Sequence, residues 1–123
     1  MPQGSIVAVL DDLFFTVKIH EAAKRSGVPI TFVKSEIDAL QQAQNSPDLI
    51  ILDLNCTVLD PFKVIAALKS DPNTKMISLL GYVSHVQGEL KLQAQQAGCD
   101  MVLARSAFSQ NLPVLLKRYT DRR

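Results

Sequence analysis

Short apolar segments alternate along the chain with longer amphipathic segments. The apolar segments consist mainly of Val, Ile and Leu without regular polar interruptions, which is typical of strands buried on both faces of a parallel sheet. We predict strands at residues 5–10, 30–33, 49–54, 77–83 and 101–104. We predict helices at residues 13–26, 35–45, 62–70, 87–97 and 109–119. This alternation predicts an α/β fold in which helices cover both faces of one sheet.

Residues at the predicted element boundaries support these assignments. Gly27 and Gly98 stand where helices should end, and glycine is favoured there because it adopts the left-handed conformation without strain. Ser35 and Asp38 have the spacing of a capping box, which marks a helix start. A further glycine, Gly81, lies inside a predicted strand and indicates either a close approach to that backbone or a local irregularity of the strand.

Composition limits the size and the class of the protein. A chain of 123 residues is long enough for one hydrophobic core, so we predict a single domain spanning residues 1–123. With 13 basic and 12 acidic residues the net charge is +1, which gives no basic surface for nucleic acid or an anionic membrane. The sequence shows neither a long apolar span nor a signal-peptide pattern, so we expect a cytoplasmic protein.

Charged residues gather where the predicted strands end. In parallel α/β sheets, ligands bind beyond the carboxyl ends of the strands. Asp11 and Asp12 follow the first strand, Asp53 ends the third, and Arg105 follows the fifth. Three carboxylates at one edge repel each other, and oxygen ligands of this kind suit Mg²⁺ or Mn²⁺. A structural alternative is that Asp11 and Asp12 only cap the helix that follows them.

The chain resembles the receiver domains of bacterial two-component response regulators over essentially its whole length. The resemblance rests on four segments, which are VLDD (9–12), LIILDLN (49–55), SDPNTK (70–75) and QAGCD (96–100). It implies a flavodoxin-like, doubly wound sheet of five parallel strands in the order 2-1-3-4-5, inside three α/β/α layers. Short right-handed crossovers favour the same order, with two helices on one face and three on the other.

The same resemblance assigns roles to the charged residues. Asp53 would accept a phosphoryl group from a histidine kinase in a phosphorelay. Asp11 and Asp12 would bind Mg²⁺ weakly, together with Asp53 and the backbone carbonyl of Asn55. Arg105 would contact the phosphoryl group. Such a phosphoacceptor assists its own phosphorylation and is not a turnover enzyme.

Several positions depart from the receiver pattern, and two of them concern groups that would contact the phosphoryl group. Val83 stands where receivers carry a Thr or Ser hydroxyl that contacts the phosphoryl group. Ser84 is a second candidate for that contact, and His85 is a candidate for phosphate contact or protein docking. Arg105 replaces the usual Lys, and its planar guanidinium is longer than a lysine ammonium. We therefore expect an atypical receiver with a muted conformational response.

Two other functions fit parts of the sequence. A receiver fold without the hydroxyl can act as a phosphorylation-independent protein-binding module, a pseudo-receiver. The segment LDLNCTVLD (52–60) also resembles the first motif of haloacid-dehalogenase-type phosphatases. Those enzymes place a second Asp two residues after the nucleophile as a general acid, whereas Asn55 cannot transfer that proton.

The expected partners follow from the resemblance to receivers. Phosphoryl transfer requires a histidine kinase or a phosphotransfer protein. The sequence shows no output domain after Arg123, so we expect a stand-alone regulator that contacts a separate downstream protein. A homodimer is a further option, and we expect neither nucleic acid nor membrane as a partner.

Overall fold

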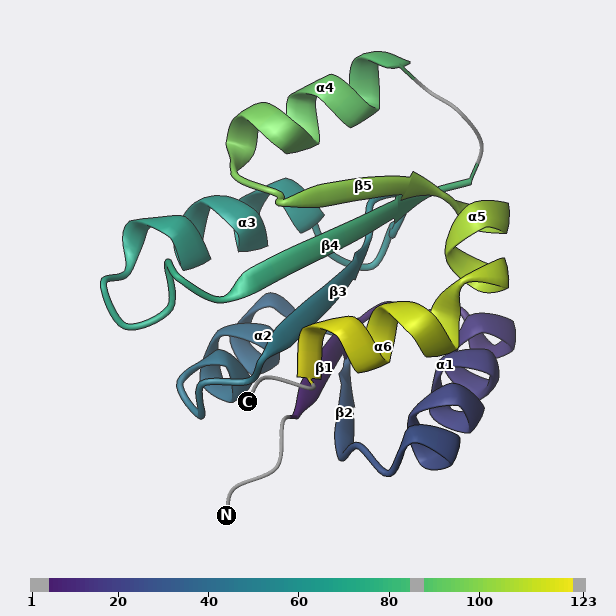
Figure 1. Ribbon diagram of the computed structural model, residues 1–123. Coiled ribbons are helices and arrows are strands. Elements are labelled where there is room, and N and C mark those ends of the chain that lie inside the picture. The colour runs from purple at the N-terminus through teal and green to yellow at the C-terminus, as the bar shows by residue number, and fades with distance from the viewer. Residues whose placement is uncertain (1–4, 85–87, 121–123) are drawn as a thin grey trace.

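The computed structural model describes residues 5–84 and 88–120, and the elements below belong to these ranges. Five parallel strands form one sheet in the order β2-β1-β3-β4-β5 (Figure 1). The strands are β1 (Ile6–Val9), β2 (Ile30–Val33), β3 (Leu49–Asp53), β4 (Ser78–Val83) and β5 (Met101–Ala104). The predicted sheet, its parallel direction and its strand order are confirmed.

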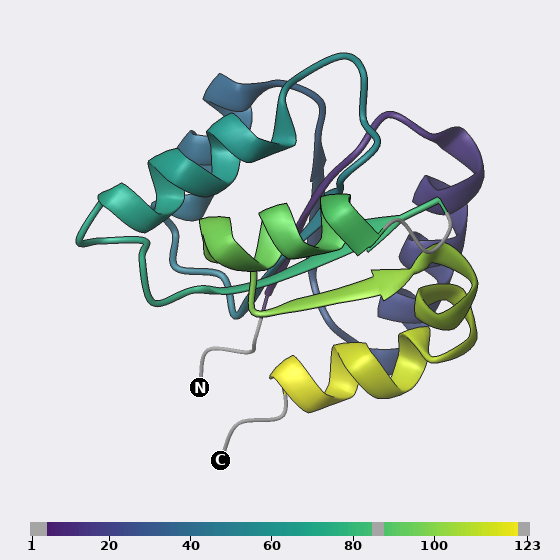
Figure 2. The same ribbon diagram turned by 90° about the horizontal axis from the view of Figure 1, so that it is seen from above.

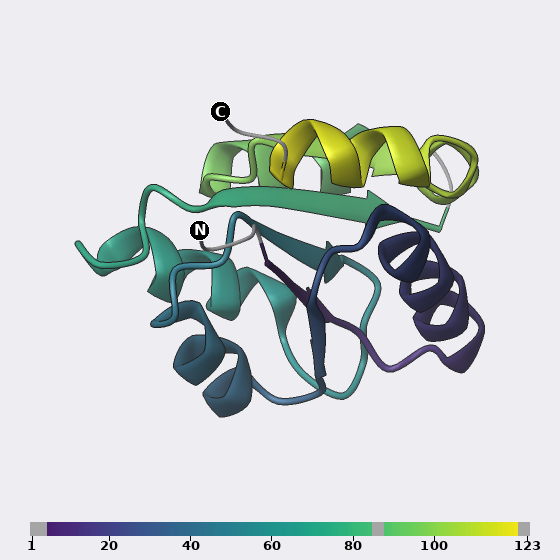
Figure 3. The same ribbon diagram turned by 60° about the horizontal axis from the view of Figure 1, so that its bottom comes forward.

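Helices cover both faces of the sheet (Figures 2 and 3). On one face lie α2 (Glu36–Ala43), α3 (Pro61–Ser70) and α4 (Gly88–Ala97). On the other lie α1 (Leu13–Ser26), α5 (Arg105–Gln110) and α6 (Leu112–Thr120). The described residues therefore place three helices on each face, and the predicted division into two and three is wrong.

The difference comes from the last predicted helix, at 109–119, which is two helices in the structure. α5 begins directly after β5, and Asn111 interrupts the helical path with φ −105° and ψ 12°. The second helix then starts with Pro113 in its first turn. Proline has no N–H and is tolerated in the first turn of a helix, so it favours a new helix start at this point.

The predicted boundary signals act as expected. Gly27 ends α1 with a left-handed φ of 68°. The Ser35 hydroxyl caps α2 by accepting from the Asp38 backbone N–H at 3.1 Å. Gly81 lies in β4, where an added Cβ would stand 2.8 Å from the Leu54 side chain, so the predicted close approach is confirmed.

The core consists of two apolar clusters, one on each face of the sheet. Successive residues of a strand point to opposite faces, so Ile50 and Leu52 enter one cluster while Leu49 and Ile51 enter the other. Because both faces are buried, every central position of β3 must be apolar. This requirement explains the continuous apolar runs of the sequence.

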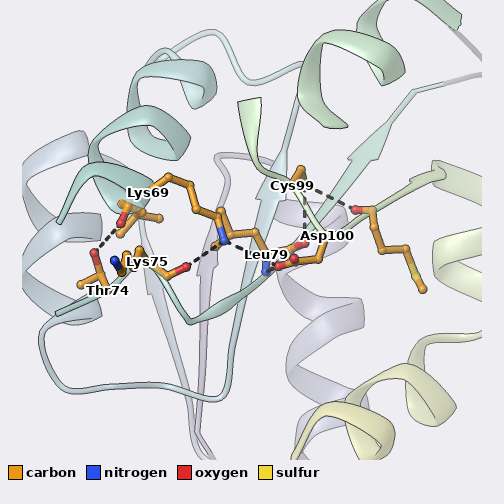
Figure 4. Close-up of polar contacts among 8 residues, drawn as sticks. Lys69, Thr74, Lys75, Leu79, Cys99 and Asp100 are labelled. Carbon is orange, nitrogen blue, oxygen red and sulfur yellow. Dashed lines mark hydrogen bonds and ion pairs between the residues drawn. The ribbon is translucent and has the colours of Figure 1, made fainter. Parts of the chain in front are cut away.

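A polar network fastens the edge of the sheet where the strands begin (Figure 4). The Asp100 carboxylate accepts from the Leu79 backbone N–H at 2.8 Å, and the Leu79 carbonyl accepts from the Asp100 backbone N–H at 2.9 Å. Lys69 approaches the same carboxylate to 3.9 Å and donates to the Lys75 carbonyl at 3.0 Å. These contacts hold β4, β5 and α3 together at the amino ends of the strands. Asp11, Asp12, Asp53 and Arg105 lie at the opposite edge, where the strands end.

The close contact at Gly81 yields a stability prediction. Gly81→Val should lower the free energy of unfolding by about 1–3 kcal/mol, because the new side chain would collide with Leu54 and with the Cys99 sulfur. Urea denaturation measures this change. Gly88→Ala is the matched control, since nothing lies within 4 Å of the position that its new Cβ would take. Equal stability of the valine variant and the unaltered protein would contradict the tight packing.

Candidate functional site

A polar cavity of about 430 Å³ opens at the carboxyl ends of the strands. It gathers the predicted charged residues together with residues of the loops after β1, β3 and β4. Its lining consists of Asp11, Asp12, Leu13, Asp53, Asn55, Cys56, Thr57, Tyr82, Ser84 and Arg105. The sheet thus brings together residues that lie far apart in the sequence, as their positions at the strand ends predict.

Asp12 uses both of its carboxylate oxygens. Oδ1 accepts from the Phe15 backbone N–H at 3.3 Å and caps α1. Oδ2 forms an ion pair and hydrogen bond with Nη2 of Arg105. The guanidinium also lies over the Phe15 ring, 4.6 Å from its centroid, in a cation–π arrangement. Asp12 therefore caps α1, as the structural alternative predicts, but it does more than cap, because the same side chain also holds Arg105 in the cavity.

Asp11 is paired more loosely. Its Oδ1 lies 3.4 Å from Nζ of Lys34, and their side chains are 40% and 73% exposed respectively. Exposed pairs of this kind contribute little to stability, because water screens the charges and both side chains lose freedom. The Asp11 carboxylate can therefore exchange its lysine for another cation at low cost.

Asp53 stands at the end of β3, and its Oδ1 accepts from the Asn55 backbone N–H at 2.9 Å. Partial burial raises the pKa of Asp53 above its ordinary value, while that N–H and the charge of Arg105 act in the opposite direction. Among the described residues Arg105 forms its ion pair with Asp12 and none with Asp53. The Asp53 carboxylate is therefore poorly neutralised, and additional positive charge would stabilise its ionised form.

Asn55 connects two loops of the cavity. Its side-chain Oδ1 accepts from the Ser84 backbone N–H at 2.7 Å, which joins the loop after β3 to the loop after β4. This contact places Ser84 in the cavity lining. The resemblance to receivers implies a role only for the backbone carbonyl of Asn55, and it does not predict this use of the side chain.

The remaining predicted positions lie elsewhere. Val83 is 2% exposed and packs in the apolar cluster beneath α2, α3 and α4, so it does not line the cavity. His85 lies outside the described residues.

Tyr82 is a cavity residue that was not predicted from the sequence. It is 1% exposed, it lines the cavity, and no protein group among the described residues accepts a hydrogen bond from its hydroxyl. Burial raises the pKa of Tyr82 well above its ordinary value, and the nearby Asp53 and Asp12 charges add to this effect. Its position in a nearly continuous apolar strand made it look like an ordinary core residue. The only sequence signal was its hydroxyl next to a strand end.

The donor chemistry of the cavity fits a hard divalent cation. The described residues contain no group of three or more Asp, Glu, His or Cys side chains arranged to hold a metal ion. Mg²⁺ does not need such a group, because one or two carboxylates and several waters satisfy it. The cavity supplies oxygen ligands from Asp11, Asp12 and Asp53, and Asp12 would first have to release Arg105.

Comparison with known proteins identifies similar regulators. No protein-family model matches the chain. It is 28% identical over 119 residues to the transcriptional regulatory protein PrrA of Mycobacterium tuberculosis, and 27% identical to that of Mycobacterium leprae. The match covers 96% of this chain and 50% of PrrA. The chain thus spans about half the length of the curated relatives it matches.

Solved structures of receivers have the same fold. The phosphorylated cyanobacterial phytochrome response regulator RcpA gives a TM-score of 0.82 at 22% identity, covering 96% of this chain and 94% of its own. The chemotaxis response regulator CheY4 of Vibrio cholerae gives 0.83 at 21% identity, covering 96% and 99%. The receiver domain of the sensor histidine kinase PA1611 from Pseudomonas aeruginosa, with magnesium in its active-site cleft, gives 0.82 at 22%, covering 98% and 100%.

These comparisons confirm the resemblance to response-regulator receivers. Identities near 22% show the fold alone, so the roles of individual residues still depend on the geometry of this chain. Within residues 5–84 and 88–120, no helix has the length and apolar character needed to cross a membrane.

The shifted pKa of Asp53 predicts a pH-dependent stability difference. Its native pKa lies above the ordinary 3.8, so ionised Asp53 destabilises the fold above the native pKa, and the penalty disappears as pH falls below 3.8. Asp53→Asn should therefore raise the free energy of unfolding at neutral pH, and the gain should vanish in acid. Urea denaturation at several pH values measures the free energy of unfolding of the variant and of the unaltered protein, and so shows both the gain and its loss in acid.

Asp71 is the control, because its pKa is shifted in the opposite direction to that of Asp53. Hydrogen bonds from the Asn73 backbone N–H and the Gln44 side chain lower its pKa. Asp71→Asn should therefore lower stability at neutral pH, with the loss fading in acid. A loss of stability in Asp53→Asn at neutral pH would show that the carboxylate is better neutralised than its contacts indicate.

Proposed function

We propose that this chain, which has the receiver fold and resembles response regulators, accepts a phosphoryl group on Asp53 in phosphorelay signal transduction. The observation that carries the proposal is the position of Asp53, which lies in a polar cavity at the strand ends with Arg105 and two further aspartates. A carboxylate in such a place can act as a nucleophile where positive charge offsets that of the incoming group.

The reaction needs one bond to form and one to break. An oxygen of the Asp53 carboxylate attacks phosphorus, and the bond from phosphorus to the donor breaks as the new P–O bond forms. With phosphohistidine the electron pair stays on the imidazole nitrogen, and with acetyl phosphate it leaves on acetate. The Asn55 backbone N–H occupies one Asp53 oxygen, which leaves the other available for attack.

Asp11, Asp12 and the Asn55 carbonyl are the groups that would hold a divalent cation beside Asp53. When bound, such a cation supplies positive charge to the oxygens of the transferring phosphoryl group. Asp11 can release Lys34 easily because that pair is exposed. Asp12 must give up Arg105, which is held by an ion pair and by the Phe15 ring, so metal binding should be weak.

Arg105 has two roles in this scheme. In the structure it neutralises Asp12, and its charge also favours the ionised form of Asp53. A phosphoryl group on Asp53 offers three oxygens that can accept from the guanidinium fork. Arg105 would then move from Asp12 toward the phosphoryl group. In this scheme the chain is a phosphoacceptor that assists its own phosphorylation, and it is not a turnover enzyme.

The partners in this proposal are a histidine kinase or a phosphotransfer protein and a separate downstream protein in the bacterial cytoplasm. The magnesium in the receiver of PA1611 and the phosphorylation of RcpA support a metal-assisted acceptor, since both proteins share this fold. The chain's nearly balanced charge gives no support for nucleic acid or membrane binding.

A second candidate function is a phosphorylation-independent protein-binding module. An apolar groove of about 660 Å³ between α1 and α6 favours it. Leu13, Phe14 and Val17 line the groove and are 80%, 68% and 53% exposed. Exposed apolar side chains in such a group are typical of protein contact surfaces. In this case the Asp12–Arg105 pair would be a permanent structural contact.

Phosphorylation from a small donor separates the two candidates. Incubation with acetyl phosphate and Mg²⁺ should add the mass of one phosphoryl group, and Asp53→Asn should prevent it because an amide is not a usable nucleophile. Intact-mass measurement gives the result. Asp38→Asn, which alters an exposed aspartate on α2, is the control and should still be phosphorylated. An unchanged mass in the unaltered protein would favour the binding module.

Metal binding gives an independent prediction. Calorimetric titration should show weak Mg²⁺ binding that disappears when Asp11 and Asp12 are both changed to Asn. Arg105→Gln should strengthen binding several-fold, because it removes a cation that competes for Asp12. Lys34→Gln is the control and should change the affinity less, since Lys34 is largely exposed. Undiminished binding in the double variant would place the metal elsewhere.

A further inference from the structure

The hydroxyl of Tyr82 is buried without a partner in a cavity of otherwise charged and polar groups. The residue is 1% exposed, and no protein group among the described residues accepts from its O–H. A buried hydroxyl that lacks a partner costs free energy, so native structures seldom keep one without a use. The buried hydroxyl without an acceptor therefore needs an explanation, whereas a core tyrosine with a bonded hydroxyl would need none.

The Tyr82 ring is held rigidly by two phenylalanines. It stacks on Phe108 with centroids 4.7 Å apart and an angle of 12°, and it meets Phe15 edge-on at 5.1 Å. Phe15 also lies beneath the Arg105 guanidinium. The ring is therefore fixed by the same aromatic group that positions the cation of the site.

Tyr82 lies beside Asp53 in the sheet and lines the same cavity. The charged groups that influence its pKa are Asp53, Asp12 and Arg105, which all line the cavity. Tyr82 is also the register partner of Asp53 in the sheet, so both side chains leave neighbouring strands on the same face. Val83, one residue further, points into the opposite core cluster.

We propose that the Tyr82 phenol donates a hydrogen bond to an oxygen of the phosphoryl group on Asp53, in place of the hydroxyl that is absent at Val83. This role rests on the proposed phosphorylation of Asp53. It makes Tyr82 a specificity-determining residue for a tetrahedral anion, since an anion at Asp53 supplies the acceptor that the hydroxyl lacks. Arg105, at the start of α5, and Tyr82, in β4, would then both contact that anion.

Ser84 is the competing source of a hydroxyl. It also lines the cavity, but it is only partly buried and its backbone N–H is fixed on Asn55. A partly exposed hydroxyl can exchange its hydrogen bond with water, so it gains little from an anion. The Tyr82 hydroxyl is shielded from water by its burial. It should therefore gain more free energy than the Ser84 hydroxyl from a hydrogen bond to an anion.

Beryllofluoride, a phosphoryl mimic that binds an ionised carboxylate, tests this assignment in the full chain with Mg²⁺ present. Fluorine NMR titration gives its affinity for the unaltered protein and for Tyr82→Phe, which keeps the ring and removes the hydroxyl. The affinity should fall about tenfold in the variant, the size of one hydrogen bond to a charged group. Tyr119→Phe, which removes a hydroxyl outside the cavity, is the control and should bind nearly as the unaltered protein does. Ser84→Ala tests the competing hydroxyl and should lose less affinity than Tyr82→Phe.

Two further readouts exclude a purely structural role. Tyr82→Phe should unfold at the same or a higher urea concentration, because the hydroxyl that it removes has no protein partner. The chain has two tyrosines and no tryptophan, so tyrosine fluorescence in a Tyr119→Phe background reports on Tyr82 alone. That fluorescence should change on beryllofluoride binding if the hydroxyl gains an acceptor.

The outcomes separate this proposal from the one on which it rests. Equal beryllofluoride affinity in Tyr82→Phe and the unaltered protein would overturn the role of Tyr82 and leave Asp53 as the acceptor. If Ser84→Ala, and not Tyr82→Phe, lost tenfold in beryllofluoride affinity, the contact would be assigned to Ser84. A complete lack of beryllofluoride binding by the unaltered protein would overturn both proposals.

Discussion

A parallel sheet covered on both faces can carry charged residues only where its strands begin and end. The central positions of β3 must be apolar because both of its faces are buried, so Asp53 can stand only at the end of that strand. The same constraint places Asp12 just beyond β1 and Arg105 just beyond β5. The cavity lies where the parallel strands end, and the polar residues at those ends determine what it can bind.

The Asp12–Arg105 pair is the main contact across those strand ends. In the sheet order, β3 and β4 lie between β1 and β5, so the pair passes the ends of the two strands that carry Asp53 and Tyr82. Arginine suits this reach better than lysine, since it is longer and its planar head can stack on Phe15 while it donates to a carboxylate. The replacement of the usual lysine is therefore matched by an aromatic surface that holds the larger side chain.

The sequence predicted the sheet well because its signal is local. Continuous apolar runs mark strands buried on both faces, and all five lie within about two residues of their predicted positions. The last helix was mispredicted because Pro113, the local signal of a new helix start, was placed inside one helix at 109–119. The Asp12–Arg105 pair and the aromatic contacts of Tyr82 were not predictable, since they join residues distant in sequence and depend on side-chain direction. A tyrosine in an apolar strand gives no local sign that its hydroxyl lacks a partner.

Under the proposed function, an anion at Asp53 and a cation at Asp12 would be coupled through Arg105. Arg105 now occupies one oxygen of Asp12, and the helix cap occupies the other. A phosphoryl group that attracted the guanidinium would free one Asp12 oxygen, and that oxygen is a ligand of the kind Mg²⁺ prefers. The anion would then favour the cation, and by linkage the cation would favour the anion to the same extent. One arginine shared between two carboxylate sites is sufficient for this reciprocity, without a large movement of the sheet or its helices.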